Sequence, residues 1–592
     1  MRPIAMNSNL HAGTVKEIVH HGKDQLIYTA DFTGLTQLWQ AKPGTRGSEQ
    51  TSFTEDRITF ATYIKHKSIF IIGMDFAGNE RHQLYVLTLD GTLLPLTNAP
   101  EHTHIYGGSS PDGNWIAWSS DRRHPEFLDI YIQNLNTFDI YPAFIGYGSY
   151  TSLKWSPDGY SLLIKRTNTS TDNDLGLLQI GTGQVSWLTQ HSGEASFKDP
   201  HFSSDGNHLF LLTNKDREFF GLASLNFLNK NLTWLLQEQW DLEELTINKG
   251  KNKLAFSINE RGISRGMVAD LEQNALFTWK TPMGVIANLV FSEDDQNIAF
   301  IFSGPAHPPD IWHVDLHTMQ AQEKHTTTVG ELAGHLIEPF FISYRSFDNL
   351  DIPALYYQPK NTAYKLPVVI YLHGGPETQS RPEFNPLLQH LLSQGYAICT
   401  PNVRGSTGYG KTYSHLDDAR RRMDSVKDLV WLVQWLITAE NVDPKKIALI
   451  GGSYGGFMVL SAITHYPDFW SAAIDISGIS SIKAFLQHTS PWRRKQREAE
   501  YGTVERDAEF FDRIDPIHYT ERITAPLMVI HGATDPRVPI EESEQLVNRL
   551  RSRGHPVRYI RFEDEGHSLA KRVNRRVAYS AIVDFLNRNN GL

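Results

Sequence analysis

The chain has 592 residues, a formal net charge of −10 at pH 7 and a single cysteine. This length is too great for one hydrophobic core, so we expect at least two domains. The negative charge argues against a dedicated nucleic-acid binder, which normally carries a basic face or tail. A lone cysteine, Cys399, cannot form an internal disulfide, and nothing therefore indicates an oxidising compartment.

The N-terminal residues 1–7 lack the apolar core of a signal peptide. No stretch approaches the ~18 apolar residues that a membrane-spanning helix requires. Together these observations predict a cytoplasmic protein with neither a membrane nor a nucleic-acid partner. Two short basic runs, 420–422 and 493–495, are flanked by acids or by helical pattern, so we interpret them as solvated helix faces.

The first half of the chain repeats a polar turn motif, each copy followed by a short apolar run. The copies begin at residues 110, 156, 203, 248 and 292, which gives spacings of 46, 47, 45 and 44 residues. A repeat near this length, built of short strands and Asp-Gly turns, is typical of β-propeller blades. One blade cannot bury both of its faces, whereas a closed ring of blades can.

Two weaker repeat units, 27–53 and 58–96, precede these copies. Residues 22–328 therefore have room for about seven blades at the period of ~40–50 residues that blades show. An array of β-sandwiches is the alternative, and the regular period favours the propeller. Residues 1–21 are predicted to form an N-terminal extension.

The pattern changes near residue 330, and residues 329–592 are predicted to form an α/β-hydrolase domain. After two opening strands, continuous apolar runs alternate with amphipathic stretches. This alternation indicates a mostly parallel sheet covered on both faces, with functional residues at the carboxyl ends of its strands. The eight expected strands are 340–344, 352–357, 368–372, 397–400, 447–450, 472–476, 527–531 and 557–562.

Residues 446–456 predict a strand, a Gly-x-Ser-x-Gly turn and a helix, with Ser453 in the middle of the turn. This is the context of the nucleophile elbow, in which a strained turn exposes a serine hydroxyl. Glycines flank the serine because side chains there would clash with neighbouring elements. Ser453 is therefore the candidate nucleophile.

A nucleophilic serine needs a base, and the base needs an orienting acid. In this fold the acid follows the serine along the chain and the histidine comes last. Asp535 lies just after the expected strand 527–531, and His567 lies in a Gly-His turn after the strand 557–562. We therefore predict a catalytic triad of Ser453, Asp535 and His567.

Two groups of residues compete for these roles. The acids at 563–565 are close to His567 in sequence, and residues so close on one loop reach its ring nitrogen poorly, so we expect solvated charges there. His531 precedes Asp535, which favours a structural role in the loop. The triad assignment is therefore unchanged.

The oxyanion hole should use two backbone N–H groups, one of them from the residue after the serine. That residue is Tyr454. The sequence His373-Gly374-Gly375-Pro376 follows an expected strand and is similar to the glycine-rich oxyanion loop of esterases and peptidases, so the Gly375 amide is the expected second donor. His373 is expected to pin the loop rather than to act in catalysis.

The order of these motifs resembles that of the prolyl oligopeptidase family, and the preceding propeller extends the resemblance over nearly the whole chain. The His-Gly-Gly-Pro loop is most similar to that of the acylaminoacyl-peptidase branch. No paired-glutamate motif of the dipeptidyl peptidase IV type is found in the propeller, which argues against dipeptide release. The motifs are His373-Gly374-Gly375-Pro376, residues 402–410, 451–456 and 531–539, and Gly566-His567.

The resemblance implies a propeller that caps the active site and admits short or unstructured peptides. It also implies that Arg537 grips a substrate carbonyl or carboxylate, for which its planar fork of donors is suited. A surface ion pair is the alternative for Arg537. A homo-oligomer is expected from the resemblance alone.

The leading hypothesis is a serine peptidase that hydrolyses short peptides with an acylated or otherwise blocked N-terminus. An esterase or amidase acting on a specialised acylated metabolite would use the same triad. A propeller binding protein with an inactive hydrolase domain and a transacylase are further alternatives. No metal or organic cofactor is expected, because the triad needs none and neither H-E-x-x-H nor C-x-x-C occurs.

Overall fold

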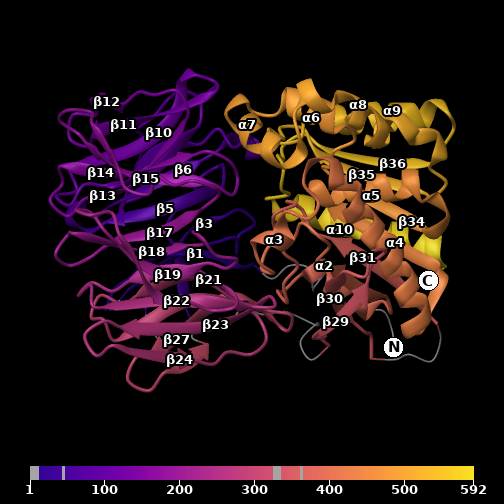
Figure 1. The fold of residues 1–592 in the computed structure, drawn as a ribbon, viewed down its shortest axis with the longest axis horizontal. Coiled ribbons are helices and arrows are strands. Elements are labelled where there is room, and N and C mark those ends of the chain that lie inside the picture. The colour runs from indigo at the N-terminus through magenta and orange to yellow at the C-terminus, as the bar shows by residue number, and fades with distance from the viewer. Residues whose placement is uncertain (1–12, 24, 43–46, 324–334, 361–364, 592) are drawn as a thin grey trace.

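The computed structural model describes residues 13–23, 25–42, 47–323, 335–360 and 365–591. An all-β domain and an α/β domain lie side by side (Figure 1). The all-β domain comes first in the chain and is drawn from indigo to magenta, and the α/β domain is drawn from orange to yellow.

The all-β domain is a propeller of seven four-stranded blades. The strands of each blade pair antiparallel in chain order. First strands of neighbouring blades contact one another, as β1 does with β5 and β25, which places them around the central channel. The strands are β1 (Val15–His21), β2 (Leu26–Ala30), β3 (Gln37–Ala41) and β4 (Ser48–Gln50) in blade 1; β5 (Ile58–Ile64), β6 (Ile69–Met74), β7 (Gln83–Thr88) and β8 (Leu93–Pro95) in blade 2; β9 (His104–Ser109), β10 (Trp115–His124), β11 (Phe127–Asn134) and β12 (Ile140–Phe144) in blade 3; β13 (Ser149–Trp155), β14 (Ser161–Thr167), β15 (Asn173–Gln179) and β16 (Val185–Trp187) in blade 4; β17 (Phe197–Phe202), β18 (His208–Thr213), β19 (Gly221–Asn226) and β20 (Leu232–Leu236) in blade 5; β21 (Asp241–Ile247), β22 (Lys253–Glu260), β23 (Ile263–Asp270) and β24 (Ala275–Trp279) in blade 6; β25 (Val285–Phe291), β26 (Asn297–Gly304), β27 (His307–Asp315) and β28 (Gln320–Glu323) in blade 7.

The repeated turn motif connects the first and second strands of blades 3 to 7. Its serine and aspartate side chains bond to each other, with 2.5 Å between Ser110 Oγ and Asp112 Oδ1 and the same distance between Ser156 Oγ and Asp158 Oδ1. Side chains of this kind close tight turns, which explains why the motif returns at the same place in successive blades from blade 3 onward. The predicted propeller is thus confirmed.

Blade 1 begins earlier in the chain than predicted. Strand β1 already starts at Val15 and pairs with β2, so the predicted start of the propeller at residue 22 is wrong. The strand carries charged side chains because it borders the central channel, where Glu17 accepts a hydrogen bond from the Ala61 amide. These charges hide the alternation of apolar and polar residues by which a strand is predicted from sequence. The predicted boundary between residues 328 and 329 lies outside the described residues.

The α/β domain is built on one eight-stranded sheet in the order β29-β30-β32-β31-β33-β34-β35-β36. Strands β29 and β30 pair antiparallel, and the six strands from β32 to β36 in that order run parallel. This confirms the predicted fold class. The strands are β29 (Phe340–Arg345), β30 (Asp351–Tyr357), β31 (Leu366–Leu372), β32 (Ala397–Pro401), β33 (Val442–Gly452), β34 (Ala472–Ile476), β35 (Leu527–Gly532) and β36 (Val557–Phe562).

Helices cover both faces of this sheet, and each face has its own buried hydrophobic cluster. Alternate side chains of a strand such as β33 enter opposite clusters, Leu449 on one face and Ile450 on the other, which is why the strands read as continuous apolar runs. Among the described residues, no helix is long and apolar enough to cross a membrane. The helices are α2 (Pro386–Ser393), α3 (Lys411–Ser414), α4 (Arg422–Ala439), α5 (Tyr454–His465), α6 (Ile482–His488), α7 (Pro491–Tyr501), α8 (Val504–Ile514), α9 (Glu541–Ser552) and α10 (Arg572–Asn590).

Side-chain hydrogen bonds join the last blade to the first. The side-chain oxygen of Asn288 in β25 accepts a hydrogen bond from the backbone amide of Ile18 in β1. The backbone amide of Asn288 donates to Glu244 Oε2 of β21 at 2.7 Å. Asn288 lies at φ +54°, a left-handed conformation that glycine adopts without strain. A glycine at this position would therefore remove the acceptor and keep the backbone.

We expect Asn288→Gly to lower the free energy of unfolding by about 1–3 kcal/mol, because it leaves the Ile18 amide without its partner. Thermal unfolding followed by circular dichroism measures the effect. The matched control is Asn274→Gly, since Asn274 is exposed and has φ +50° in a hairpin turn. Equal melting temperatures for the two variants would contradict the prediction.

Candidate active site

Ser453 occupies the sharp turn between β33 and α5. Its backbone has φ 57° and ψ −120°, an unusual conformation for a residue other than glycine. The turn leaves no room for flanking side chains, because a Cβ added to Gly451 would lie 2.2 Å from the Gly455 carbonyl oxygen. The Ser453 amide donates to the Ile476 carbonyl oxygen at 2.9 Å and ties the turn to β34. These are the features of a nucleophile elbow.

Asp535 lies in the loop after β35 and is held by four groups. Its Oδ1 accepts bonds from the amides of Arg537 at 2.8 Å and Val538 at 3.0 Å. Its Oδ2 lies 2.7 Å from His567 Nδ1 and 3.3 Å from His531 Nε2. Burial alone would raise the pKa of this carboxyl. The interactions with His531 and His567 lower it by more, so the pKa lies well below its usual range. Asp535 is therefore a carboxylate at neutral pH.

His567 lies in the loop after β36 and points Nδ1 at Asp535. A carboxylate only accepts, so Nδ1 carries the proton and Nε2 is left as the basic nitrogen. Among the hydrogen bonds of the described residues, none joins Ser453 Oγ to His567. The structure thus brings the predicted acid and base into direct contact and places the serine at the same edge of the sheet.

The glycine-rich loop after β31 lies against the nucleophile turn. A Cβ added to Gly374 would be 3.4 Å from Ser453 Cβ, and Gly375 has φ +118°, where glycine is favoured. His373 contacts the Gly374 carbonyl oxygen through Nδ1 at 2.8 Å and Ser406 Oγ through Nε2 at 2.9 Å. The predicted donors, the amides of Gly375 and Tyr454, thus belong to two segments that flank Ser453.

A buried arginine anchors the side chain of Tyr454. The Tyr454 hydroxyl donates to Asp417 Oδ2 at 2.8 Å, and Arg422 donates to both Asp417 and the Tyr454 oxygen. Arg422 is only 1% exposed and also donates to the Glu500 carbonyl oxygen at 2.9 Å. The interpretation of the basic run 420–422 as a solvated face is therefore wrong for Arg422. A run of like charges carries no signal for which member turns inward.

Arg537 forms an ion pair across the domain interface. Its Nε donates to Glu80 Oε1 of the propeller at 2.7 Å, and Arg493 of α7 donates to Glu80 Oε2 at 3.1 Å. The Arg537 side chain remains 45% exposed. Arg537 thus forms the ion pair that is its alternative role, and this pair joins the two domains. A role in gripping substrate stays a prediction.

The loops of the acid and the base both touch blade 2. Thr534 Oγ1 donates to the Ala77 carbonyl oxygen at 2.6 Å. Gly566, next to His567, packs so closely that a Cβ there would lie 1.9 Å from the Gly78 carbonyl oxygen. Domain packing therefore bears directly on the position of the His567 loop.

Residues 382–592 match the model of the prolyl oligopeptidase family. The catalytic domain belongs to this family. The chain is 25% identical to dipeptidyl aminopeptidase BIII of Pseudoxanthomonas mexicana, covering 94% of this chain and 84% of that enzyme. It is 28% identical to the acylamino-acid-releasing enzyme of Mus musculus, over 38% of this chain and 32% of that enzyme. The solved structure of a Mycobacterium tuberculosis puromycin-hydrolyzing peptidase superposes with a TM-score of 0.87 at 18% identity, covering 100% of this chain and 96% of that one.

These matches confirm the resemblance drawn from the motifs, including the acylaminoacyl-peptidase branch among the relatives. The protein is a serine peptidase whose catalytic domain matches the prolyl oligopeptidase family. Its fold, a propeller followed by an α/β-hydrolase domain, is that of the solved structure. The roles of the individual site residues remain predictions.

We expect Arg422→Leu to destabilise the peptidase by about 3–5 kcal/mol, because Asp417 would be left as a buried carboxylate without its cation. Thermal unfolding measures the loss. Arg420→Leu is the control from the same basic run, since the Arg420 side chain is 69% exposed and its pair with Asp507 contributes little. Similar melting temperatures for the two variants would refute the buried-pair explanation.

We also expect Gly566→Ala to lower kcat/KM at least tenfold, because the added methyl group must push the His567 loop or blade 2 out of place. Gly181→Ala is the control, since a Cβ on Gly181 meets no atom within 4 Å. Initial rates on a peptide anilide measure both variants. Full activity of Gly566→Ala would show that the loop contact is irrelevant to catalysis.

Proposed function

We propose that this peptidase hydrolyses short peptides with Ser453 as nucleophile, His567 as base and Asp535 as orienting acid. The observation that carries the proposal is the buried 2.7 Å bond between His567 Nδ1 and Asp535 Oδ2, at the sheet edge where the strained turn presents Ser453. This arrangement of acid, base and elbow serves acyl transfer.

In the proposed reaction Ser453 Oγ attacks the peptide carbonyl carbon while His567 Nε2 takes its proton. Asp535 stabilises the imidazolium that forms, and the amides of Tyr454 and Gly375 bind the oxyanion. His567 then protonates the leaving amine, and a water molecule repeats the cycle to release the acid. Removing one oxyanion donor in such sites costs about 3–4 kcal/mol of barrier.

The size of the substrate is limited by the propeller. Blade 2 contacts the loops of both Asp535 and His567, through Ala77 and Gly78, and Glu80 pairs with Arg537. A folded protein domain cannot pass between surfaces in such contact. Short or unstructured peptides are therefore the proposed substrates.

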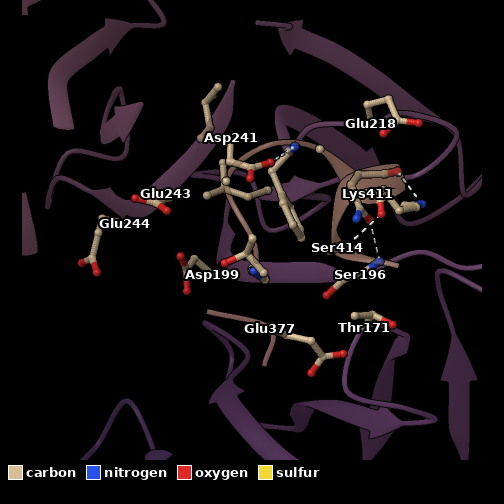
Figure 2. A pocket seen from close by; sticks show the side chains of 18 of the residues that line it. Thr171, Ser196, Asp199, Glu218, Asp241, Glu243, Glu244, Glu377, Lys411 and Ser414 are labelled. Atoms are coloured by element: carbon tan, nitrogen blue, oxygen red, sulfur yellow. Dashed lines mark hydrogen bonds between the residues drawn. The ribbon is translucent and has the colours of Figure 1, made fainter. Parts of the chain in front are cut away.

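A cavity of about 480 Å³ lies between propeller and catalytic domain, next to the oxyanion loop, where Glu377 follows Gly375 by two residues (Figure 2). Acidic side chains outnumber basic ones on its wall. Burial raises the pKa of Asp241 to about 6 and that of Glu244 to about 7, so part of this charge is neutralised near pH 7. The acids are Glu194, Asp199, Glu218, Asp241, Glu243, Glu244 and Glu377, and the bases are Lys198, Arg381 and Lys411.

Two kinds of amino terminus are candidates for the substrate. An N-acylated peptide is expected from the resemblance to acylaminoacyl peptidases, one of which is among the relatives. A free amino terminus is the second candidate, because a protonated amine is attracted to the acidic cavity and the relative that spans 94% of this chain is a dipeptidyl aminopeptidase. An ester or amide of an acylated small molecule is the remaining alternative. A cytoplasmic location and homo-oligomerisation also remain predictions.

The test compares wild type and Ser453→Ala on five substrates: an N-acetyl-aminoacyl anilide, a free aminoacyl anilide, a free dipeptidyl anilide, a longer blocked peptide and a short acyl ester. We expect hydrolysis of short peptide substrates that Ser453→Ala abolishes. Preference for the acetylated anilide selects the first kind of terminus, and preference for a free amine selects the second. Turnover of the ester alone would reject the peptide proposal, and activity in Ser453→Ala would reject the nucleophile.

A variant of the cavity wall extends this test. Glu377→Gln should lower kcat/KM for free-amine substrates more than for acetylated ones if the acidic wall attracts the terminus. Equal effects on both classes would remove the electrostatic argument for a free amine.

A further inference from the structure

The carboxylate of Asp535 is shared by two histidines. Its Oδ2 lies 2.7 Å from His567 Nδ1 and 3.3 Å from His531 Nε2. The sequence suggested only a structural role in the loop for His531, and a triad needs only one histidine. The second histidine therefore calls for an explanation.

His531 lies in β35 and is fully buried, with a partner on each ring nitrogen. Nε2 is 3.0 Å from the Val538 carbonyl oxygen, and Nδ1 is 2.6 Å from Ser543 Oγ of α9. A carbonyl oxygen only accepts, so Nε2 carries a hydrogen that it donates to Val538, and the same nitrogen lies 3.3 Å from Asp535 Oδ2. The Ser543 hydroxyl then donates to Nδ1 and fixes this tautomer.

The charged groups around His531 are few. Asp535 lies on its own loop, and Asp475 of the neighbouring strand β34 is a fully buried carboxyl whose charge acts on His531. Glu542 of α9 acts on Asp475 and accepts hydrogen bonds from Ser480. Burial lowers the pKa of His531, but its bond to Asp535 raises it more, so it lies above the usual value. Whether the His531 ring is neutral or protonated, its Nε2 remains a hydrogen-bond donor.

We propose that His531 is a positioning residue of this peptidase, which holds Asp535 Oδ2 through Nε2 and so limits how strongly that oxygen attracts the His567 ring. The proposal rests on the triad of the proposed function. Its geometry is the shared oxygen: Oδ2 bonds to His567 Nδ1 and lies 3.3 Å from His531 Nε2, while Oδ1 accepts from the amides of Arg537 and Val538.

The direction of the effect follows from hydrogen bonding. A carboxylate oxygen that accepts one bond is a weaker acceptor for a second, so removal of His531 strengthens the pull of Asp535 on the His567 proton. The charged form of the His567 ring is then favoured. Because the base must be neutral to accept the serine proton, activity is lost at a higher pH on the acidic side. Loosening of the Asp535 loop lowers kcat in addition.

The experiment measures kcat/KM against pH for a peptide anilide with His531→Leu and His531→Gln. The acidic limb is the part of this pH profile in which kcat/KM falls as the pH drops. For His531→Leu we expect this limb to move to higher pH by about half a unit to one unit. His531→Gln should restore the limb toward wild type, because its side-chain amide can donate near the position of Nε2. A merely structural residue would change stability or kcat and leave the limb in place.

The control is His390→Leu, since His390 is a buried histidine of α2 with no charged group acting on it. It should leave the limb unchanged. An unmoved or lowered limb in His531→Leu, or the same shift in His390→Leu, would overturn the proposal. The two failures are separable: labelling of Ser453 by a fluorophosphonate reports on the triad, and an unlabelled wild type would reject the proposed function instead.

If His531→Leu does not fold, Ser543→Ala replaces it. Without the Ser543 hydroxyl, Nδ1 loses its donor and the ring is held less firmly, while the Val538 carbonyl oxygen still keeps the hydrogen on Nε2. The hold of His531 on Asp535 Oδ2 therefore weakens. We expect a smaller shift of the limb in the same direction. A folded Ser543→Ala with an unmoved limb would overturn the proposal equally.

Discussion

The active site depends on one property of a parallel sheet: strands that run in one direction end at one edge. Strands β33, β35 and β36 therefore deliver Ser453, Asp535 and His567 to the same edge, although they are far apart in the chain. That edge also meets the propeller, because the loops after β35 and β36 contact blade 2. The same interface therefore lies against the loops that carry Asp535 and His567.

Buried charges hold the loops that this edge presents. Arg422 and Asp417 form an ion pair that contacts the Tyr454 hydroxyl, and Asp535 is surrounded by two amides and two histidines. A buried charge is tolerated only where its partners are fixed, so each network also fixes the segments that carry it. The catalytic loops thus gain their rigidity from ionic contacts as much as from hydrophobic packing.

The fold and the chemistry leave the substrate open, because one scaffold serves several substrates through its pocket. The relatives carry the names of a dipeptidyl aminopeptidase and an acylamino-acid-releasing enzyme, and the superposed structure that of a puromycin-hydrolyzing peptidase. Beside the glycine-rich loop this chain has an acidic cavity, and the free amino terminus proposed for the substrate rests on the charge of that cavity.

The sequence by itself determined the features that short segments encode. The turn repeat predicted the blades, the alternation of apolar runs predicted the parallel sheet, and the elbow with its chain order predicted the triad residues. The predicted blades and the predicted sheet were confirmed, because periodicity and turn chemistry act over a few residues, whereas the roles of the triad residues stay predictions. Only the tertiary structure decided that β1 belongs to blade 1, that Arg422 is buried, that Glu80 meets Arg537 and that His531 shares Asp535. Each of these depends on which partners meet when the chain folds, and such a partner can be hundreds of residues away, as Glu80 is from Arg537.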